Sequence, residues 1–259
     1  MPVTALPAAT VPAASVRFDR VDALRGLAMV WMTVFHFCFD LSHFGLWPQN
    51  FLGDPFWTWQ RSAIVSLFLF CAGLGQAIAL YQGQGWARFR RRWLQIAAAA
   101  LLVSLGSYWM FPHTFIYFGV LHGMAVMLVL VRLMVGYGRW LWPLGALALA
   151  LPWLADILLN GPWAVAAPWF DSRLLNGLGL ISHKPFTEDY VPVLPWLGVM
   201  CWGMLAGQWL LRKHPGRLSR PLGGVGRRLA VLGRWSLSYY LLHQPVLLGL
   251  LSVYMWLKA

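Results

Sequence analysis

Long apolar stretches alternate with short polar segments along almost the whole chain. Each stretch approaches the roughly 20 residues that a helix needs to cross a bilayer core. They cover residues 21–44, 62–81, 93–111, 115–135, 140–158, 192–211 and 233–257. Helices are expected because lipid tolerates only backbone groups that are hydrogen-bonded within the chain, and no segment alternates as a barrel strand does. The pattern predicts an all-α polytopic membrane protein, a bundle of about seven transmembrane helices.

The segments outside these stretches predict a single domain with a short tail. Residues 1–16 are rich in Ala and Pro and lack the basic start and apolar core of a secretory signal. We expect them to form a disordered cytoplasmic tail, and residues 17–259 to form one transmembrane domain. The longest connecting segment, 159–191, is too polar to span a membrane, and we expect it to lie over the outer face as a lid.

Composition agrees with a membrane environment. Hydrophobic residues make up 59% of the chain and charged residues 11%, against roughly 25% charged residues in a soluble domain. A soluble protein of this composition could not cover its own surface with polar groups. The three cysteines, Cys38, Cys71 and Cys201, all fall inside apolar stretches. We therefore expect buried thiols, with neither a disulfide framework nor a metal site.

The net charge of +12 first suggests a nucleic-acid partner, but the distribution of the charge argues against one. The basic residues occur in short runs between apolar stretches instead of along one soluble face. If the N-terminus is inside the cell, all of the basic residues fall on the inner side except Arg61, Arg173, Lys184 and Lys258. This bias predicts an N-terminus inside, a C-terminus outside, and a multi-pass protein of the bacterial inner (plasma) membrane surrounded by lipid.

The first apolar stretch, RVDALRGLAMVWMTVFHFCFDLSHFG, carries ionisable residues at helical spacing. One face of the helix would present Asp22, Arg25, Met29, His36, Asp40 and His43. An Asp at membrane depth costs about 2.5–3.5 kcal/mol, so this face must meet protein or water. Asp40 can accept a hydrogen bond from one ring nitrogen of His36 and make the other more basic, which suits acyl transfer. Alternatively, the stripe only joins helices through polar contacts.

Other intramembrane polar residues are candidates for the same cavity. His43 lies near the interface and is a weaker catalytic candidate. His122 and the pair His243 and Gln244 could line a substrate cavity, since Pro245 can loosen the helix around them. Each of these histidines could equally be a satisfied core residue.

Arginines near the inner face have two interpretations. The run RFRRR contains Arg88, Arg90, Arg91 and Arg92. It can anchor the chain to anionic lipid, or bind the phosphates of a cytoplasmic donor such as coenzyme A. Arg25 shares this face and is a candidate for the second role, although Asp22 can also be its partner. No motif for nucleotide hydrolysis, zinc binding or a serine hydrolase stands in a suitable context.

The same first helix carries a resemblance to a known family. Together with SLFLFCAGLGQAIAL, FIYFGVLHGMAVM, YVPVLPWLGVMCWGMLAGQ and LGRWSLSYYLLHQPVLL, it resembles the heparan-alpha-glucosaminide N-acetyltransferase catalytic-domain family, including its short bacterial members. The opening and closing blocks are also similar to the wider group of transmembrane sugar acyltransferases. The resemblance implies transfer of an acetyl group from cytoplasmic acetyl-CoA to an extracytoplasmic sugar or envelope glycan. It also implies histidine chemistry near the outer face, in a region where this sequence offers His43.

Three hypotheses follow. In the leading one, acetyl-CoA enters past Arg25, His36 is the general base, Asp40 orients it, and the outer loop admits the sugar acceptor. In the second, a transporter or lipid-handling protein uses His36 and Asp40 as a proton relay. In the third, a non-catalytic membrane protein presents its outer loop to another envelope protein. The identity of the acceptor and the oligomeric state, a homo-oligomer included, are left open.

Overall fold

A computed structural model describes residues 17–258, which form helices joined by loops, without a β-strand. The long helices are α1 (Asp19–His43), α2 (Pro55–Tyr81), α3 (Trp86–Met110), α4 (Val120–Leu133), α5 (Leu141–Leu159), α7 (Val193–Lys213) and α10 (Ser236–Lys258). The prediction of an all-α membrane bundle is confirmed. The predicted tail, residues 1–16, and the last residue of the chain lie outside the described residues.

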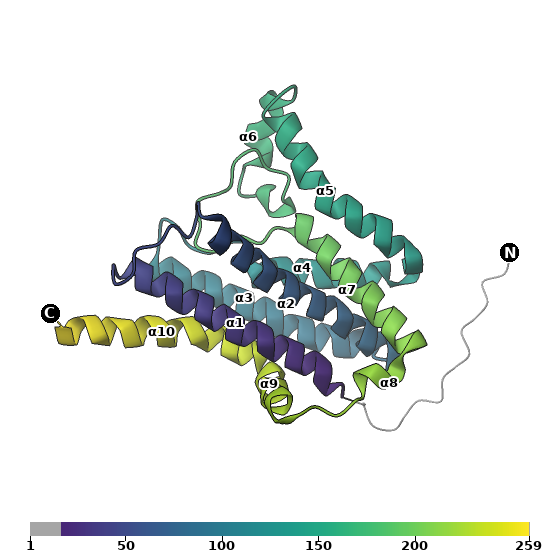
Figure 1. The fold of residues 1–259 in the computed structure, drawn as a ribbon. Helices are drawn as coiled ribbons and strands as arrows, with labels where there is room; N and C mark the ends of the chain where they lie inside the picture. Colours follow the sequence, from purple (N-terminus) through teal and green to yellow (C-terminus); the bar gives the residue numbers. More distant parts are fainter. Residues whose placement is uncertain (1–16, 259) are drawn as a thin grey trace.

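Six helical stretches are long and apolar enough to cross a membrane, and one of them is the continuous stretch Val120–Leu159. This stretch contains both α4 and α5, joined by the 3-10 helix η1 (Met134–Trp140). Gly138 interrupts it with a φ of 52°, a conformation that glycine adopts without strain. Figure 1 shows α4 and α5 pointing in different directions from this bend. The number of seven spans and the N-inside orientation stay predictions.

The bundle has two ends that differ in character. The loop face carries residues 44–54, 111–119 and 160–192, and the basic face carries residues 82–85, η1 and residues 214–223. In Figure 1 the basic face is on the right, and α1, α2, α3, α4 and α7 lie side by side between the two faces. Helix α5 diverges from this group, and the far end of α10 extends beyond the end of α1.

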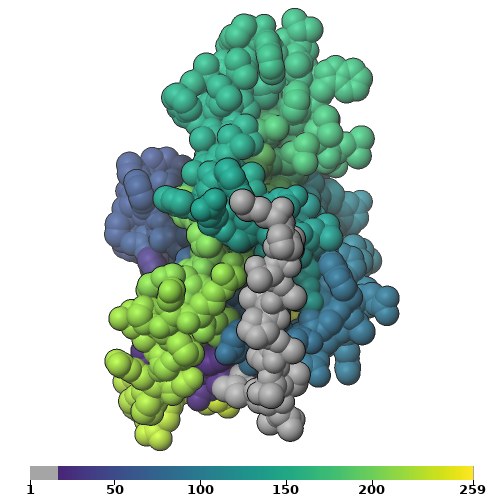
Figure 2. All heavy atoms as spheres, turned by 90° about the vertical axis from the view of Figure 1, so that its right-hand side faces the viewer, coloured from purple at the N-terminus to yellow at the C-terminus, as the bar shows by residue number. Residues whose placement is uncertain are grey.

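Two further helices cover the basic face. Helix α8 (Pro215–Leu218) leads to α9 (Gly224–Arg234), which the apolar pattern does not predict because it is short and rich in arginine. Helix α9 packs on α1 almost backbone to backbone: a Cβ on Gly26 would lie 2.0 Å from the Leu229 carbonyl oxygen. Figure 2 looks onto this face and shows the yellow-green α8–α9 region on one side and the blue start of α3 on the other.

The loop of residues 160–192 is tied to the neighbouring loop of residues 111–119. It contains the short helices η2 (Ala164–Ala166), α6 (Ala167–Phe170) and η3 (Asn176–Leu178). The Arg173 guanidinium lies over the rings of Phe115 and Tyr117, at 5.5 Å from each centroid. Asn176 donates a hydrogen bond to the Tyr117 hydroxyl at 2.6 Å. These contacts hold the loop against the bundle.

The predicted faces of α1 agree with its packing. Asp22, Met29 and Asp40 are buried, whereas Leu27 and Val34 on the opposite side are 44% and 56% exposed. An apolar surface of this kind is what lipid would cover. The helical spacing in the sequence therefore identified which side of α1 points into the bundle.

The contact between α2 and α7 allows a test of the packing. A Cβ on Gly73 would lie 2.0 Å from the Met200 carbonyl oxygen, and backbone cannot move aside as a flexible side chain can. We expect Gly73→Ala to lower the free energy of unfolding by about 1–3 kcal/mol, as overpacking does. The measurement is reversible unfolding in detergent. Gly249→Ala is the matched control, since nothing lies within 4 Å of a Cβ there. Equal stability of the two variants would contradict the described packing.

Candidate functional site

Helices α1 and α10 bring two histidines into contact. The ring centroids of His36 and His243 are 5.1 Å apart, and the rings are inclined at 64°. Nδ1 of His243 lies 2.7 Å from the Tyr240 carbonyl oxygen. Because a carbonyl only accepts, this nitrogen carries the proton, and Nε2 of a neutral His243 then has a free lone pair. Both His243 Nε2 and His36 Nδ1 are buried without a hydrogen-bond partner in residues 17–258.

A carboxylate and an amide lie beside this pair. Asp40 is 1% exposed, and its Oδ1 accepts a hydrogen bond of 2.7 Å from Nε2 of Gln244. The predicted hydrogen bond between Asp40 and His36 is not formed among the described residues. The Asp40 side chain instead crosses the contact between α1 and α10, where the amide of Gln244 is the available donor. Asp40 Oδ2 and Gln244 Oε1 are buried without a partner in the same part of the structure.

Four unpartnered polar atoms therefore gather around one contact between two helices: His36 Nδ1, Asp40 Oδ2, His243 Nε2 and Gln244 Oε1. A buried polar atom without a hydrogen bond costs about 1–3 kcal/mol. Folded proteins leave few of them, and each one calls for an explanation. Such atoms favour the binding of a polar ligand that brings hydrogen-bond partners of its own. This cluster is the candidate functional site.

An apolar cluster lies beside the site and continues along α1 toward the basic face. It includes Met29, Met32 and Phe35 of α1, packed against Trp57 and Ile64 of α2. The polar stripe expected along α1 is thus interrupted between Arg25 and His36. These two residues are eleven positions apart, which corresponds to about 16 Å along the helix axis. The two polar regions of α1 are distinct and lie toward opposite ends of the bundle.

His122 has other partners. Its Nδ1 accepts a hydrogen bond from the Gly119 backbone N–H at 3.3 Å, so Nε2 carries the proton and lies 3.0 Å from the Ser104 hydroxyl. Both ring nitrogens are used within α3, α4 and the turn before α4. The structure thus gives His122 the contacts of a satisfied core histidine. None of its recorded contacts in residues 17–258 is with His36 or His243.

His43 is the last residue of α1 and is exposed. Its ring meets the edge of the Phe44 ring at 5.5 Å. It also lies close enough to Asp40 for their charges to interact. His43 therefore borders the candidate site from the loop face.

Arg25 has a protein partner at the basic face. Its Nη1 lies 3.1 Å from Oδ1 of Asp22, which is 4% exposed. The same carboxylate binds Nε of Arg17 at 2.7 Å and lies 4.0 Å from Nε of Arg234. Arg234 also binds Oδ1 of Asp19 at 2.8 Å, so two carboxylates offset part of the charge of three arginines. The Arg25 side chain is 30% exposed, so it can still meet an anion.

The remaining arginine candidates lie on the same face. Arg88, Arg90, Arg91 and Arg92 are exposed in the first turns of α3. Arg90 borders a groove of about 390 Å³ whose walls are mainly the rings of Trp86, Phe89 and Trp93. The structure brings these arginines to the face that carries Arg25. It does not bring them near the His36–His243 contact, which lies toward the other end of α1.

A half-buried carboxylate on the loop face, Asp189, was not identified from the sequence. Oδ2 of Asp189 accepts a hydrogen bond of 2.7 Å from the Val120 backbone N–H at the start of α4. Burial raises the pKa of Asp189, against the opposing effects of that hydrogen bond and of the charges of Arg61 and Lys184. Asp189 also acts electrostatically on Tyr240. Its hydrogen-bond partner is 69 positions away in the sequence, so no local spacing indicates this role.

The fold and the site define the class of protein. It is a polytopic helical membrane protein with a buried histidine pair toward one face and a cluster of arginines on the other. The family model described as "Heparan-alpha-glucosaminide N-acetyltransferase, catalytic" matches residues 17–245, and the chain belongs to this family. The resemblance seen in the sequence is confirmed. No curated protein and no solved structure matches the chain.

Proposed function

We propose that this protein transfers an acetyl group from acetyl-CoA, bound from the basic face, to a sugar or envelope glycan at the loop face. The observation that carries the proposal is the contact of His36 with His243, with four unpartnered polar atoms around it. Membership of an acetyltransferase catalytic-domain family supports the reaction class. The bacterial inner membrane, with the basic face toward the cytoplasm, is the proposed location.

The histidine pair can supply the acid–base chemistry of acetyl transfer. An acceptor hydroxyl or amine loses its proton to a free imidazole nitrogen, and its oxygen or nitrogen attacks the thioester carbonyl carbon. The bond from that carbon to sulfur then breaks, and the departing thiolate takes the proton back from the imidazolium. Because the Tyr240 carbonyl fixes the tautomer of His243, Nε2 of His243 is ready to accept a proton.

Asp40 takes a different role from the one expected in the sequence. It lies one helical turn beyond His36, so its charge can stabilise an imidazolium there. Through its hydrogen bond with Gln244 it also positions α10 against α1. We therefore propose Asp40 as a positioning residue for the histidine pair.

The donor would bind at the basic face and reach inward along α1. Arg25 lies about 16 Å from His36 along the helix axis, a separation that the pantetheine arm of coenzyme A is long enough to cover. Arg25 would then contact a donor phosphate, and Arg88, Arg90, Arg91 and Arg92 would add positive charge on the same face. The donor would have to pass the apolar cluster of Met29 and Met32.

Donor binding tests this assignment. We expect Arg25→Ala to weaken the binding of radiolabelled acetyl-CoA by about tenfold or more, the effect of losing a charge-assisted hydrogen bond. Equilibrium binding to the purified protein in detergent is the measurement. Arg139→Ala, which removes an exposed arginine from the same face, is the matched control and should bind as the wild type does. If the wild type binds no acetyl-CoA, the proposal fails, and a proton-coupled transporter becomes the better account.

A further inference from the structure

A groove opens on the loop face between the end of α5, residues 179–184 and the start of α7. Its volume is about 370 Å³, within the range of small-molecule sites. The polar side chains on its wall include Asp156, Ser182 and Lys184, and its aromatic side chains are Tyr190 and Trp196. Neither the histidine chemistry nor the donor assignment uses this groove.

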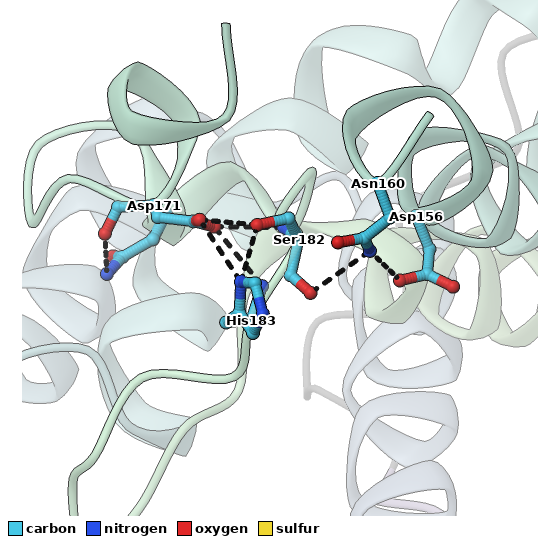
Figure 3. Close-up of polar contacts among 6 residues, drawn as sticks. Asp156, Asn160, Asp171, Ser182 and His183 are labelled. Carbon is cyan, nitrogen blue, oxygen red and sulfur yellow. Dashed lines mark hydrogen bonds and ion pairs between the residues drawn. The ribbon is translucent and has the colours of Figure 1, made fainter. Parts of the chain in front are cut away.

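Hydrogen bonds hold the wall of the groove in place, as Figure 3 shows. Asn160 donates to Oδ1 of Asp156 at 2.8 Å and to the Ser182 carbonyl oxygen at 3.4 Å. Ser182 in turn donates to Asp171 from its backbone N–H at 2.9 Å and from its hydroxyl at 2.6 Å. The end of α5 and the 171–183 segment are therefore joined by side chains. A preformed wall lowers the entropic cost of binding a ligand.

The Asp171 carboxylate anchors this network. Burial raises the pKa of Asp171, but the hydrogen bonds from Ser182 and His183 outweigh this effect and lower the pKa overall. The carboxylate is therefore ionised at neutral pH and accepts these bonds. The oxygens of Asp171 are occupied by hydrogen bonds within the wall of the groove. Asp156 is the carboxylate that faces the groove itself.

Lys184 makes the groove suitable for an anion. Within residues 17–258 it forms no ion pair, although the charges of Arg61 and Asp189 act on it. Burial and the positive charge of Arg61 lower the pKa of Lys184, and Asp189 opposes them. An anionic group of a ligand would be favoured beside this ammonium, because no carboxylate of the described residues lies within ion-pair distance of it.

The other lining groups fit a hydroxylated ring. Oδ2 of Asp156 has no hydrogen-bond partner in the described chain, so it can accept hydrogen bonds from ligand hydroxyls. Trp196 and Tyr190 add flat apolar area beside it. A few polar groups around an apolar surface are typical of small-ligand sites. Together with Lys184, they fit a sugar ring with one anionic substituent.

The groove is also linked to the histidine pair. Lys184 and Asp189 interact electrostatically, and Asp189 acts in turn on Tyr240. The Tyr240 ring centroid is 5.7 Å from that of His243. The groove and the histidine pair thus lie toward the same face of the bundle.

We propose that this groove is a binding site for an acidic sugar unit of the acceptor, with the anionic group on Lys184 and hydroxyls on Asp156. The role as an acceptor subsite rests on the proposed acetyl transfer, but binding of the sugar does not. All ligands that this proposal allows are hexoses with one anionic group, which is either a carboxylate or a phosphate.

The test measures sugar binding to the purified protein in detergent without acetyl-CoA. Binding is detected by saturation-transfer NMR. Glucuronate, glucose 6-phosphate and neutral glucose are the probes, and the two acids separate a carboxylate ligand from a phosphate ligand. At least one acidic sugar is expected to bind about tenfold or more tightly than glucose. Lys184→Met should remove this preference, whereas Lys258→Met, at an exposed lysine on the end of α10, should keep it.

A second variant separates the loss of one ligand contact from a general loss of folded protein. Asp156→Ala should weaken all three sugars while leaving the preference for the acid. Equal binding of the acids and glucose, an unchanged preference in Lys184→Met, or no binding of any sugar would each overturn the proposal. If the acidic sugars bind but acetyl-CoA is not turned over, the groove stands and the acetyltransferase function fails.

Discussion

Alanine in place of either His36 or His243 is expected to slow acetyl transfer by about 10²–10⁴-fold, the usual contribution of a general base. The two rings are in contact, and each has a buried nitrogen without a partner. Because groups that act as one unit are non-additive, the double variant should be about as slow as either single variant. The measurement is the rate at which free coenzyme A thiol is released from acetyl-CoA with glucosamine supplied as the acceptor.

Binding and folding have to be separated from chemistry in this experiment. Binding of radiolabelled acetyl-CoA should change little in the histidine variants, since the donor phosphates are assigned to the basic face. His113→Ala is the matched control, because His113 is exposed on the loop face and away from the pair. A His36→Ala protein with wild-type turnover would end the role of the pair and direct attention to His43.

Asp40→Ala is expected to lower turnover on the order of 10²-fold, the effect of misplacing catalytic groups by about an ångström. Loss of the carboxylate leaves the Gln244 amide without its partner at the contact between α1 and α10. The unpaired amide should also lower the free energy of unfolding by about 1–3 kcal/mol. Turnover and unfolding in detergent are measured on the same preparation.

The Asp40→Asn variant separates the effect of the hydrogen bond from Gln244 from the effect of the negative charge of Asp40. The asparagine carbonyl can still accept from Gln244, so stability should stay near the wild-type value. Turnover should fall less than in Asp40→Ala, but it should fall, because the charge beside the imidazolium is gone. If Asp40→Asn is as active as the wild type, the charge has no role. If Asp40→Ala keeps full activity and stability, Asp40 does not position the pair.

The apolar pattern located the long helices but misplaced several of their starts, those of α2 and α3 by the most residues. Helix α2 begins at Pro55 and α3 at Trp86, ahead of the apolar stretches expected from residues 62 and 93. The extra turns carry polar and aromatic residues that a hydropathy pattern does not count. The Asp54 side chain caps α2 by accepting a hydrogen bond of 2.8 Å from the Phe56 N–H. A cap followed by Pro55 at the first helical position is a local signal that could have been used.

The sequence of α1 predicted which of its polar residues share a face. It did not predict which residues of α10 those polar residues contact. Helical spacing correctly placed Asp40 on the inward side of α1. The bond from Gln244 to Asp40 joins residues 204 positions apart, and nothing in either segment specifies that pairing. The contact of His36 with His243 depends on the same packing of α10 on α1. Within one helix, periodicity decides which residues share a face; between helices, packing decides which faces meet.

The route of the acetyl group is the most direct test of the account. Purified protein is sealed into vesicles with glucosamine inside, and acetyl-CoA labelled on its acetyl group is added outside. Protein inserted with its basic face outward should deliver label into the vesicle as acetylglucosamine, with coenzyme A released outside. Vesicles that carry the double variant of His36 and His243 should deliver almost none. Label that stays outside, or that enters only as intact acetyl-CoA, would contradict acetyl transfer through the bundle.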